Sequence, residues 1–279
     1  MGEQPIWVTV LVNRLLGKPA AALLAALHVH PANPEYPIPN SVSMEFLVLL
    51  VAVIFFLWLK ARISTEKPGA TQQVMEMLLT NPMGVGIRDL IHDNIPHGGE
   101  EYLPLIGSIG IFILFCNLIN LIPTLEAPTA TVTVPLGCAV IVFVYYNLMG
   151  VMKHGPLGHG KHFLGPDLPM PAAPKLGLQL ILMLPIEIFS HSFRMLSLTV
   201  RLWVNMLVSE MLYVIFLGMM LAVYLALGKL GTVGYASAII PLTIPLAFIF
   251  LHIFVAILQA FVFTILPIIY VSGAVEEAH

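Results

Sequence analysis

Charge is scarce in this chain: only 10% of its 279 residues are charged, against roughly 25% in a typical soluble domain. The 12 Lys and Arg nearly balance the 15 Asp and Glu, so no basic patch points to a nucleic-acid partner. Cysteine is rarer still, with 2 residues. Cys116 and Cys138 both lie in apolar segments, where free thiols act as small hydrophobic side chains, and we assign them no redox or metal role.

Apolar sequence is what the chain has in abundance: 58% of its residues are hydrophobic and its mean hydropathy is +0.93. Apolar runs long enough to cross a bilayer recur along it, separated by polar segments. We therefore predict an all-α integral membrane protein with five membrane-crossing helices, the last two long and strongly tilted. Interfacial amphipathic helices complete the prediction, and membrane lipid is the first partner it implies.

Residues 1–43 are predicted to form a separate N-terminal interfacial or periplasmic segment. The stretch 6–27 is largely apolar, but Arg14 and Lys18 interrupt it. This pattern favours an amphipathic helix on the membrane surface. A cleavable signal sequence is the alternative, although such sequences usually begin with a basic region and this one carries Glu3.

Residues 44–279 are predicted to form a single membrane domain. Its first span, residues 43–60, is closed by basic side chains that can reach an interface. In residues 68–95 apolar side chains recur at helical spacing among polar ones, which predicts an interfacial helix. Two further spans form a hairpin over residues 103–152, because the link between them holds no Lys or Arg.

The second half of this domain begins with a polar loop over residues 153–175, rich in Gly, Pro and His. These histidines lack Cys or paired carboxylates at ligand spacing, which favours a solvated loop over a metal site. A long hairpin over residues 176–272 follows. As one helix, residues 176–227 would reach roughly 78 Å, against a hydrocarbon core of about 30 Å. The run must either break into two or lie strongly tilted, and we predict the tilt.

The distribution of Lys and Arg over the loops predicts how the chain is oriented. With five crossings, most of the loop cations fall on one side of the membrane. The positive-inside rule assigns that side to the cytoplasm, so the amino terminus is predicted outside and the carboxyl terminus inside.

A stripe of polar side chains runs through the most apolar half of the chain. Glu187, Arg194 and Arg201 are spaced by seven residues and therefore share one helical face, which His191 and Asn205 extend. Ionisable groups at bilayer depth persist where they face a water-filled path, a partner charge or a proton relay. The part of the stripe nearer the cytoplasm could line a hydrated path, with Glu276 and Glu277 at its mouth, or form a solvated helix end.

Arg201 is the residue of the stripe whose chemistry is most specific. A guanidinium stays protonated at any pH the protein meets, so it cannot relay a proton. It can hold a passing carboxylate ionised and repel cations. Glu187 is roughly 21 Å away along a helix, and Glu210 lies on the opposite face. Neither is a good intrahelical partner, which favours an external carboxylate over neutralisation within the chain.

A second set of polar residues suggests a proton relay. Glu210 has a candidate partner in His252 on the last helix, and a carboxylate with an imidazole can pass protons near neutral pH. The alternative for His252 is a hydrogen-bonded core histidine. Gln259 is seven residues beyond His252, on the same helical face, where it could orient Arg201.

Three strings in the chain resemble one known family. LSLTVRLWVNMLVSE, residues 196–210, resembles the signature SLxLRLFGNMxAGE of subunit a of the rotary F-type ATP synthase. ILQAFVFTILPIIYVSGAVEEAH, residues 257–279, is similar to that family's last helix, and NLINLIP, residues 117–123, resembles its NLxxLxP. The similarity runs from about residue 74 to the carboxyl terminus.

The chain departs from this signature at two pairs of residues. Trp203 and Val204 stand where the family usually has Phe-Gly, and Val208 and Ser209 where it usually has Ala-Gly. A valine in place of glycine adds bulk where helices pack closely, which changes the local packing around Arg201.

The resemblance implies a role for each residue singled out above. Arg201 is implied to be the stator arginine that opposes a ring carboxylate, with Asn205 and Glu210 at the family's spacing. Gln259 is implied to face the arginine and His252 to pair with the glutamate. Glu187 and Arg194 fall where the family has a glutamate and a basic residue, and His191 lies between them.

The resemblance also implies the biological setting. The implied partners are a ring of c subunits, the b subunits of the peripheral stalk and, through them, the soluble catalytic head, in a bacterial cytoplasmic (inner) membrane. Protons would pass through two offset half-channels, with no cofactor and no enzyme activity in the isolated chain. The alternative is a self-contained secondary transporter, but no inverted repeat is evident. A membrane enzyme would need a nucleophile or a metal motif such as HExxH, which the sequence lacks.

Overall fold

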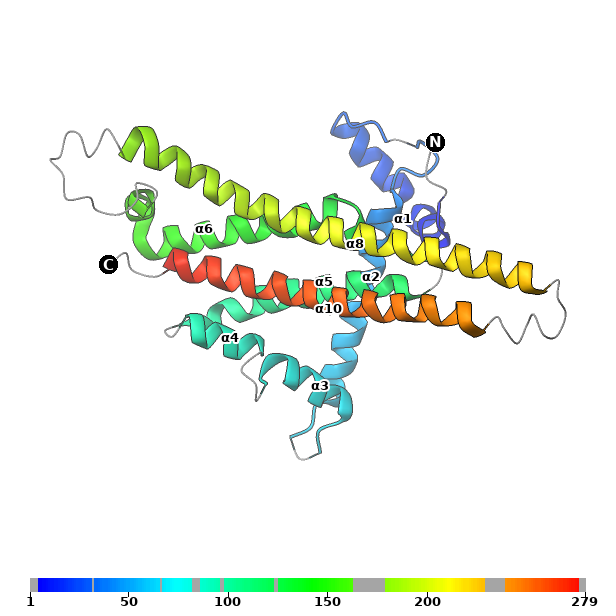
Figure 1. The fold of residues 1–279 in the computed structure, drawn as a ribbon. Helices are drawn as coiled ribbons and strands as arrows, with labels where there is room; N and C mark the ends of the chain where they lie inside the picture. The colour runs from blue at the N-terminus through cyan, green and yellow to red at the C-terminus, as the bar shows by residue number, and fades with distance from the viewer. Residues whose placement is uncertain are drawn as a thin grey trace. The chain divides into compact units, whose positions relative to one another are not determined.

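The computed structural model describes residues 5–31, 33–65, 67–81, 86–95, 98–122, 125–162, 179–228 and 239–275. Over these residues the regular secondary structure is entirely helical, which confirms the all-α prediction (Figure 1). Among them, 6 helices are long and apolar enough to cross a membrane, judged by length and composition. Five of these correspond to the predicted spans, and the additional one is the N-terminal helix.

The chain divides into two compact units. Unit 1 comprises Met1–Gly69, Ile111–Thr131 and Trp203–Ala260, and unit 2 comprises Ala70–Gly110, Val132–Leu202 and Phe261–His279. Three helices supply a segment to each unit: α5 (Leu103–Leu118), α8 (Leu184–Gly228) and α10 (Ile239–Val275).

In unit 1, α1 (Trp7–Ala26) is tied by side chains to the chain leading into α2 (Asn40–Arg62). The Asn13 amide donates to the carbonyl oxygen of Ile38 at 2.9 Å and accepts from the Ile38 N–H at 2.9 Å. The Thr9 hydroxyl donates to Asn40 Oδ1 at 2.8 Å in a buried contact. The predicted helix in this segment exists, and these hydrogen bonds hold one end of it in place.

Aromatic contacts mark the packing of the other unit 1 helices. Phe55 of α2 meets Phe115 of α5 edge-on, with ring centroids 5.6 Å apart. Phe216 of α8 stacks on Phe248 of α10 at 3.9 Å, so these two helices lie side by side here. Short 3₁₀ turns, η2 (Ile119–Leu121) and η3 (Pro128–Ala130), follow α5.

In unit 2, the single interfacial helix predicted for residues 68–95 is wrong, because two helices occupy it: α3 (Ala70–Leu79) and α4 (Ile87–Asn94). The intervening sequence NPMGVG contains a proline and two glycines, which are poor helix formers. The Asp89 carboxylate accepts from the Asn81 N–H at 2.7 Å and joins the two helices. A 3₁₀ turn, η1 (Gly99–Tyr102), then leads into α5.

The predicted polar loop at residues 153–175 begins instead as helix, since α6 (Thr133–His162) continues as far as His162. The helix is kinked at Gly155, whose φ of 71° suits a residue without a Cβ. Pro156 follows at the start of the next turn, where its missing N–H costs little. The rest of that loop, from residue 163, lies outside the described residues.

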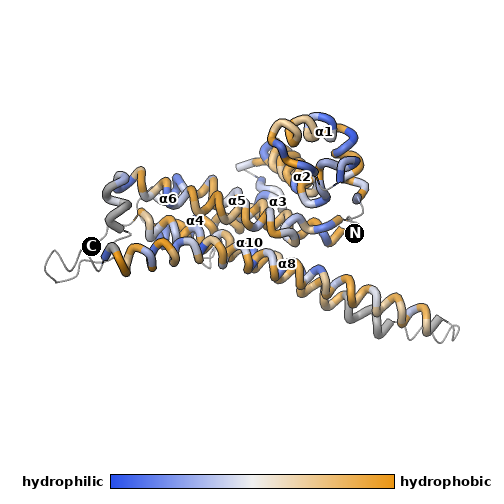
Figure 2. Tube along the Cα trace, turned by 90° about the horizontal axis from the view of Figure 1, so that it is seen from above, coloured by the Kyte–Doolittle hydropathy of each residue, from blue (hydrophilic) through white to orange (hydrophobic). Residues whose placement is uncertain are grey.

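The two long apolar runs form long helices. A short π-helix, η4 (Gln179–Met183), leads into α8, which continues unbroken for 45 residues, and α10 has 37. Of the two alternatives for the first run, the break into two helices is therefore not found in the described part. Hydrophobic residues cover most of both helices, with paler interruptions (Figure 2). Glu276 and Glu277 lie outside the described residues.

Candidate proton-path residues

His252 of α10 is held by hydrogen bonds on both ring nitrogens within unit 1. Ser209 Oγ of α8 lies 2.6 Å from Nδ1, and the backbone carbonyl oxygen of Asn117 lies 3.2 Å from Nε2. A carbonyl oxygen only accepts, so Nε2 carries a proton and Nδ1 of the neutral ring accepts from the Ser209 hydroxyl. With the ring only 4% exposed, α5, α8 and α10 together fix its orientation and tautomer.

Asn117 is itself fixed, which makes its carbonyl a stable partner for His252. Its side chain is fully buried, accepts from the Thr129 hydroxyl at 2.7 Å and donates to the Ala256 carbonyl oxygen at 3.4 Å. Because satisfied buried polar networks are rigid, the histidine sits in a preorganised site.

Asn205 and Gln259 are brought together within unit 1. The Asn205 side chain donates to Gln259 Oε1 at 3.1 Å across α8 and α10. Gln259 is fully buried, and its Nε2 has no hydrogen-bond partner among the described residues. A buried donor left unpaired is costly, which distinguishes this amide from ordinary core packing.

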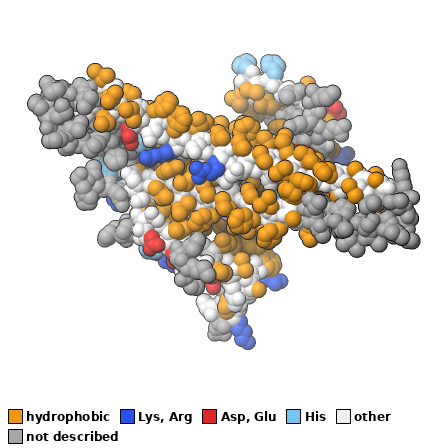
Figure 3. Space-filling view, in the orientation of Figure 1, with side chains coloured by type: hydrophobic (Ala, Val, Ile, Leu, Met, Phe, Trp, Pro, Cys, Tyr) orange, Lys and Arg blue, Asp and Glu red, His pale blue; other side chains and the backbone are white. Residues whose placement is uncertain are grey.

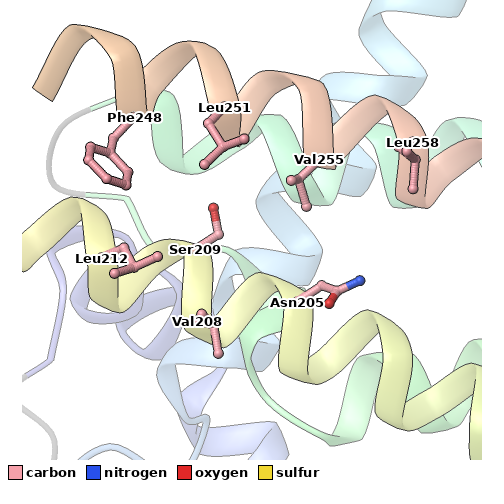
Figure 4. A pocket seen from close by; sticks show the side chains of 8 residues that line it. All are labelled: Asn205, Val208, Ser209, Leu212, Phe248, Leu251, Val255 and Leu258. Atoms are coloured by element: carbon pink, nitrogen blue, oxygen red, sulfur yellow. The ribbon is translucent and has the colours of Figure 1, made fainter. Parts of the chain in front are cut away.

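A cavity of about 300 Å³ opens between α8 and α10 beside these residues. Asn205, Val208, Ser209 and Leu212 of α8 line it together with Phe248, Leu251, Val255 and Leu258 of α10, and Figure 4 shows Ser209 pointing toward α10. Its wall is therefore apolar apart from one amide and one hydroxyl.

Glu210 follows Ser209 on α8 and is half-buried. The exposed carboxylate of Glu126, between α5 and α6, is close enough for its charge to act on Glu210. The His252 ring nitrogens, in contrast, are engaged by Ser209 and Asn117. The pairing of Glu210 with His252 thus stays a prediction.

In unit 2, Glu187 and His191 of α8 meet Tyr146 of α6. His191 Nε2 lies 3.4 Å from Glu187 Oε1, and His191 Nδ1 lies 2.9 Å from the Tyr146 hydroxyl. His191 is 6% exposed and Tyr146 1% exposed. The imidazole therefore bridges a carboxylate and a phenol inside the unit.

The two arginines of the stripe differ in their surroundings. The Arg194 guanidinium lies 5.4 Å from the ring centre of Tyr270 on α10, a cation–π contact. Arg201 is exposed, and within the described part of the chain it has no acidic partner. Figure 3 shows Lys and Arg side chains over α8 set among hydrophobic ones.

Several residues of these clusters escaped the sequence reasoning. Ser209 was visible only as a departure from the family signature. Tyr146 and Tyr270 gave a slight signal, since the hydroxyl of a phenol in an apolar span needs a partner. Glu126 gave none, because a single carboxylate in a short link is ordinary surface composition.

Comparison with known proteins gives a consistent result. The sequence model of the family described as ATP synthase A chain matches residues 42–272. ATP synthase subunit a from Koribacter versatilis (strain Ellin345) is 36% identical over 274 residues, covering 98% of both chains. The protein of that name from Solibacter usitatus (strain Ellin6076) is 37% identical over 243 residues, 87% of this chain and 90% of the relative. Nitratidesulfovibrio vulgaris (strain DP4) has one that is 38% identical over 230 residues, 82% of this chain and 84% of the relative. With its long apolar helices, this integral membrane protein belongs to the ATP synthase A chain family.

Proposed function

We propose that this chain is the stator subunit a of a proton-translocating ATP synthase. It forms two offset half-channels against a ring of c subunits and couples proton flow to ring rotation and ATP synthesis. The isolated chain is not an enzyme. Its further partners are the b subunits of the peripheral stalk and, through them, the soluble catalytic head.

Arg201 is the observation that carries the proposal. Its guanidinium is exposed on an apolar helix and has no acidic partner in the described residues. A permanent charge in that setting is costly unless a partner arrives from outside. A ring carboxylate that passes Arg201 is held ionised and releases its proton, and the same charge blocks a continuous proton leak.

The clusters on either side of Arg201 in sequence supply the two half-channels. Protons enter by Glu210 and His252, where Ser209 and Asn117 hold the histidine ring. They leave near Glu187, with His191 and Arg194 along the path. Asn205 and Gln259, joined at 3.1 Å, support the arginine site between the two paths.

The length of α8 supports a tilted arrangement. Its 45 residues span about 68 Å, more than twice the roughly 30 Å of a hydrocarbon core. A long helix lying obliquely against a ring presents both half-channels to passing carboxylates. The loop charges support an amino terminus outside and a carboxyl terminus in the cytoplasm of a bacterial inner membrane.

Replacing Arg201 in the assembled complex tests this function. Arg201→Ala should abolish proton-coupled ATP synthesis in membrane vesicles, because nothing then keeps the passing carboxylate ionised. Arg62→Ala is the matched control: it removes a guanidinium that lies 4.8 Å from the ring centre of Trp58 at the end of α2, and it should retain coupling. Normal coupling in Arg201→Ala would overturn the proposal.

Cross-linking tests the ring as partner. In a background with both cysteines replaced by Ala, Val208→Cys (47% exposed) should cross-link to co-purified c subunits, whereas Met206→Cys (0% exposed) should not. Equal yields from both positions would count against ring contact along this face. Substrate-driven transport by the purified chain alone would instead indicate a secondary transporter.

A further inference from the structure

Tyr146 is the largest fully buried side chain among the described residues. The proton path proposed above assigns it no role. Tyr146 lies on α6, whereas the polar stripe lies on α8. A tyrosine buried to this extent needs a hydrogen-bond partner for its hydroxyl. Its partner is His191 Nδ1, at 2.9 Å.

The His191 imidazole has a partner at each of its two nitrogens. The Tyr146 and His191 rings lie 5.7 Å apart, and the opposite nitrogen, Nε2, is 3.4 Å from Glu187 Oε1. A histidine hydrogen-bonded through one nitrogen presents the other in a set direction and tautomer. The phenol therefore helps to hold Nε2 toward Glu187.

We propose that Tyr146 is a positioning residue for proton release: its hydroxyl holds His191 so that Nε2 faces Glu187. This inference rests on the proposed function, which assigns Glu187 and His191 to the half-channel where protons leave. It adds a residue of the third predicted span to a site otherwise built on α8.

The proposed step adds and removes one proton at the same nitrogen, Nε2. In the neutral imidazole, Nδ1–H donates to the Tyr146 oxygen, and Nε2 takes up the proton released from a c-subunit carboxylate. The protonated imidazole keeps its Nδ1–H bond to Tyr146 and passes the Nε2 proton to Glu187, which restores the neutral form. Tyr146 keeps its own proton throughout, so it orients the relay without being a member of it.

Among the described residues, Arg194 and Tyr270 are further charged and titratable groups near the Tyr146–His191 pair. Arg194 is one turn of α8 away, and Tyr270 of α10 lies 5.9 Å from the Tyr146 ring. Glu187 and Arg194 act on a charge at His191 with opposite sign. The tyrosine oxygen adds an acceptor that serves the protonated ring most strongly, because charge-assisted hydrogen bonds are the stronger ones.

Tyr146→Phe tests the proposal in the whole ATP synthase, with Tyr145→Phe as its matched control. Both remove one phenol oxygen from α6, but Tyr145 packs edge-on against Tyr102, with ring centroids 6.3 Å apart. ATP-driven proton pumping is measured against pH in vesicles, normalised to assembled complex. Tyr146→Phe should lower pumping near pH 7 by about two- to tenfold, the worth of one hydrogen bond. It should also move the half-maximal pH about half a unit toward acid, since the protonated ring loses the stronger bond. Tyr145→Phe should change neither.

A double-mutant cycle keeps the test decisive if Tyr146→Phe assembles poorly. In a His191→Gln background, adding Tyr146→Phe should change pumping per assembled complex by less than about twofold, because the phenol acts through the histidine. A wild-type pH profile in Tyr146→Phe, or a full additional loss in the double variant, would overturn the inference. If either result is found while Arg201→Ala abolishes coupling, only the role of Tyr146 is refuted. If Arg201→Ala still couples proton flow to ATP synthesis, the proposed function itself is refuted.

Discussion

Ser209 Oγ lies 2.6 Å from His252 Nδ1, at a position where the family signature usually has glycine. The serine gives the histidine a hydrogen-bond donor that glycine cannot supply. Because the Asn117 carbonyl takes the other ring nitrogen, His252 is satisfied without a carboxylate. The proton inlet proposed for this chain therefore includes a hydroxyl immediately before Glu210.

Removing that hydroxyl should slow proton transfer through the half-channel that contains His252. Ser209→Ala leaves Nδ1 without its donor and allows the ring to reorient, so ATP-driven proton pumping should fall about two- to tenfold. Ser209→Thr keeps the hydroxyl and should retain most of the rate. Ser192→Ala, another serine of α8 whose hydroxyl bonds only locally to the Ile188 carbonyl oxygen, is the control. Equal pumping in Ser209→Ala and Ser192→Ala would contradict a role for the serine.

Glu210→Gln should slow proton flux without preventing assembly. The amide is nearly isosteric with the carboxyl group but cannot exchange a proton. Glu126→Gln should have a smaller effect, because Glu126 is exposed and acts on Glu210 only through its charge. Flux is followed in vesicles energised by an imposed pH gradient. An unchanged flux in Glu210→Gln would take this residue out of the path.

Asn13→Ala should loosen α1 from the start of α2. The substitution removes both hydrogen bonds to the Ile38 backbone and leaves that peptide group partly unpaired. The expected loss of stability is about 1 to 3 kcal/mol, seen as faster proteolysis of residues 5–31 in detergent. Asn33→Ala serves as control, because Asn33 only accepts from the exposed Glu35 N–H. Matching cleavage rates for the two variants would show that Asn13 does not anchor the helix.

Gly99→Ala should destabilise the turn before α5. A Cβ at this position would lie 2.7 Å from Ile91 Cγ2 and 3.3 Å from Ile95 Cβ. Overpacking of this kind costs about 1 to 3 kcal/mol, measurable as a lower thermal unfolding midpoint. At Gly107 of α5 a Cβ would meet nothing within 4 Å. Gly107→Ala should therefore be neutral or slightly stabilising, and a similar midpoint for both variants would refute the packing argument.

Much of the fold could be predicted from the apolar runs and the polar segments that separate them. The first span, the hairpin and the two long helices follow from hydropathy and length, because a bilayer demands long apolar helices. The residues at which helices begin and end were harder to predict from the sequence. The break between α3 and α4 and the continuation of α6 past Gly155 depend on local backbone conformation, which composition only partly specifies.

The sequence by itself determined the family, the all-helical membrane fold and the polar residues along α8. Helical periodicity alone places Glu187, Arg194 and Arg201 on one face, since that requires only a regular repeat. The tertiary structure decided which groups meet across helices: Ser209 and Asn117 on His252, and Tyr146 on His191. Such contacts join residues 43 to 135 positions apart in sequence. They depend on how helix faces pack against one another, which no local pattern in the chain encodes.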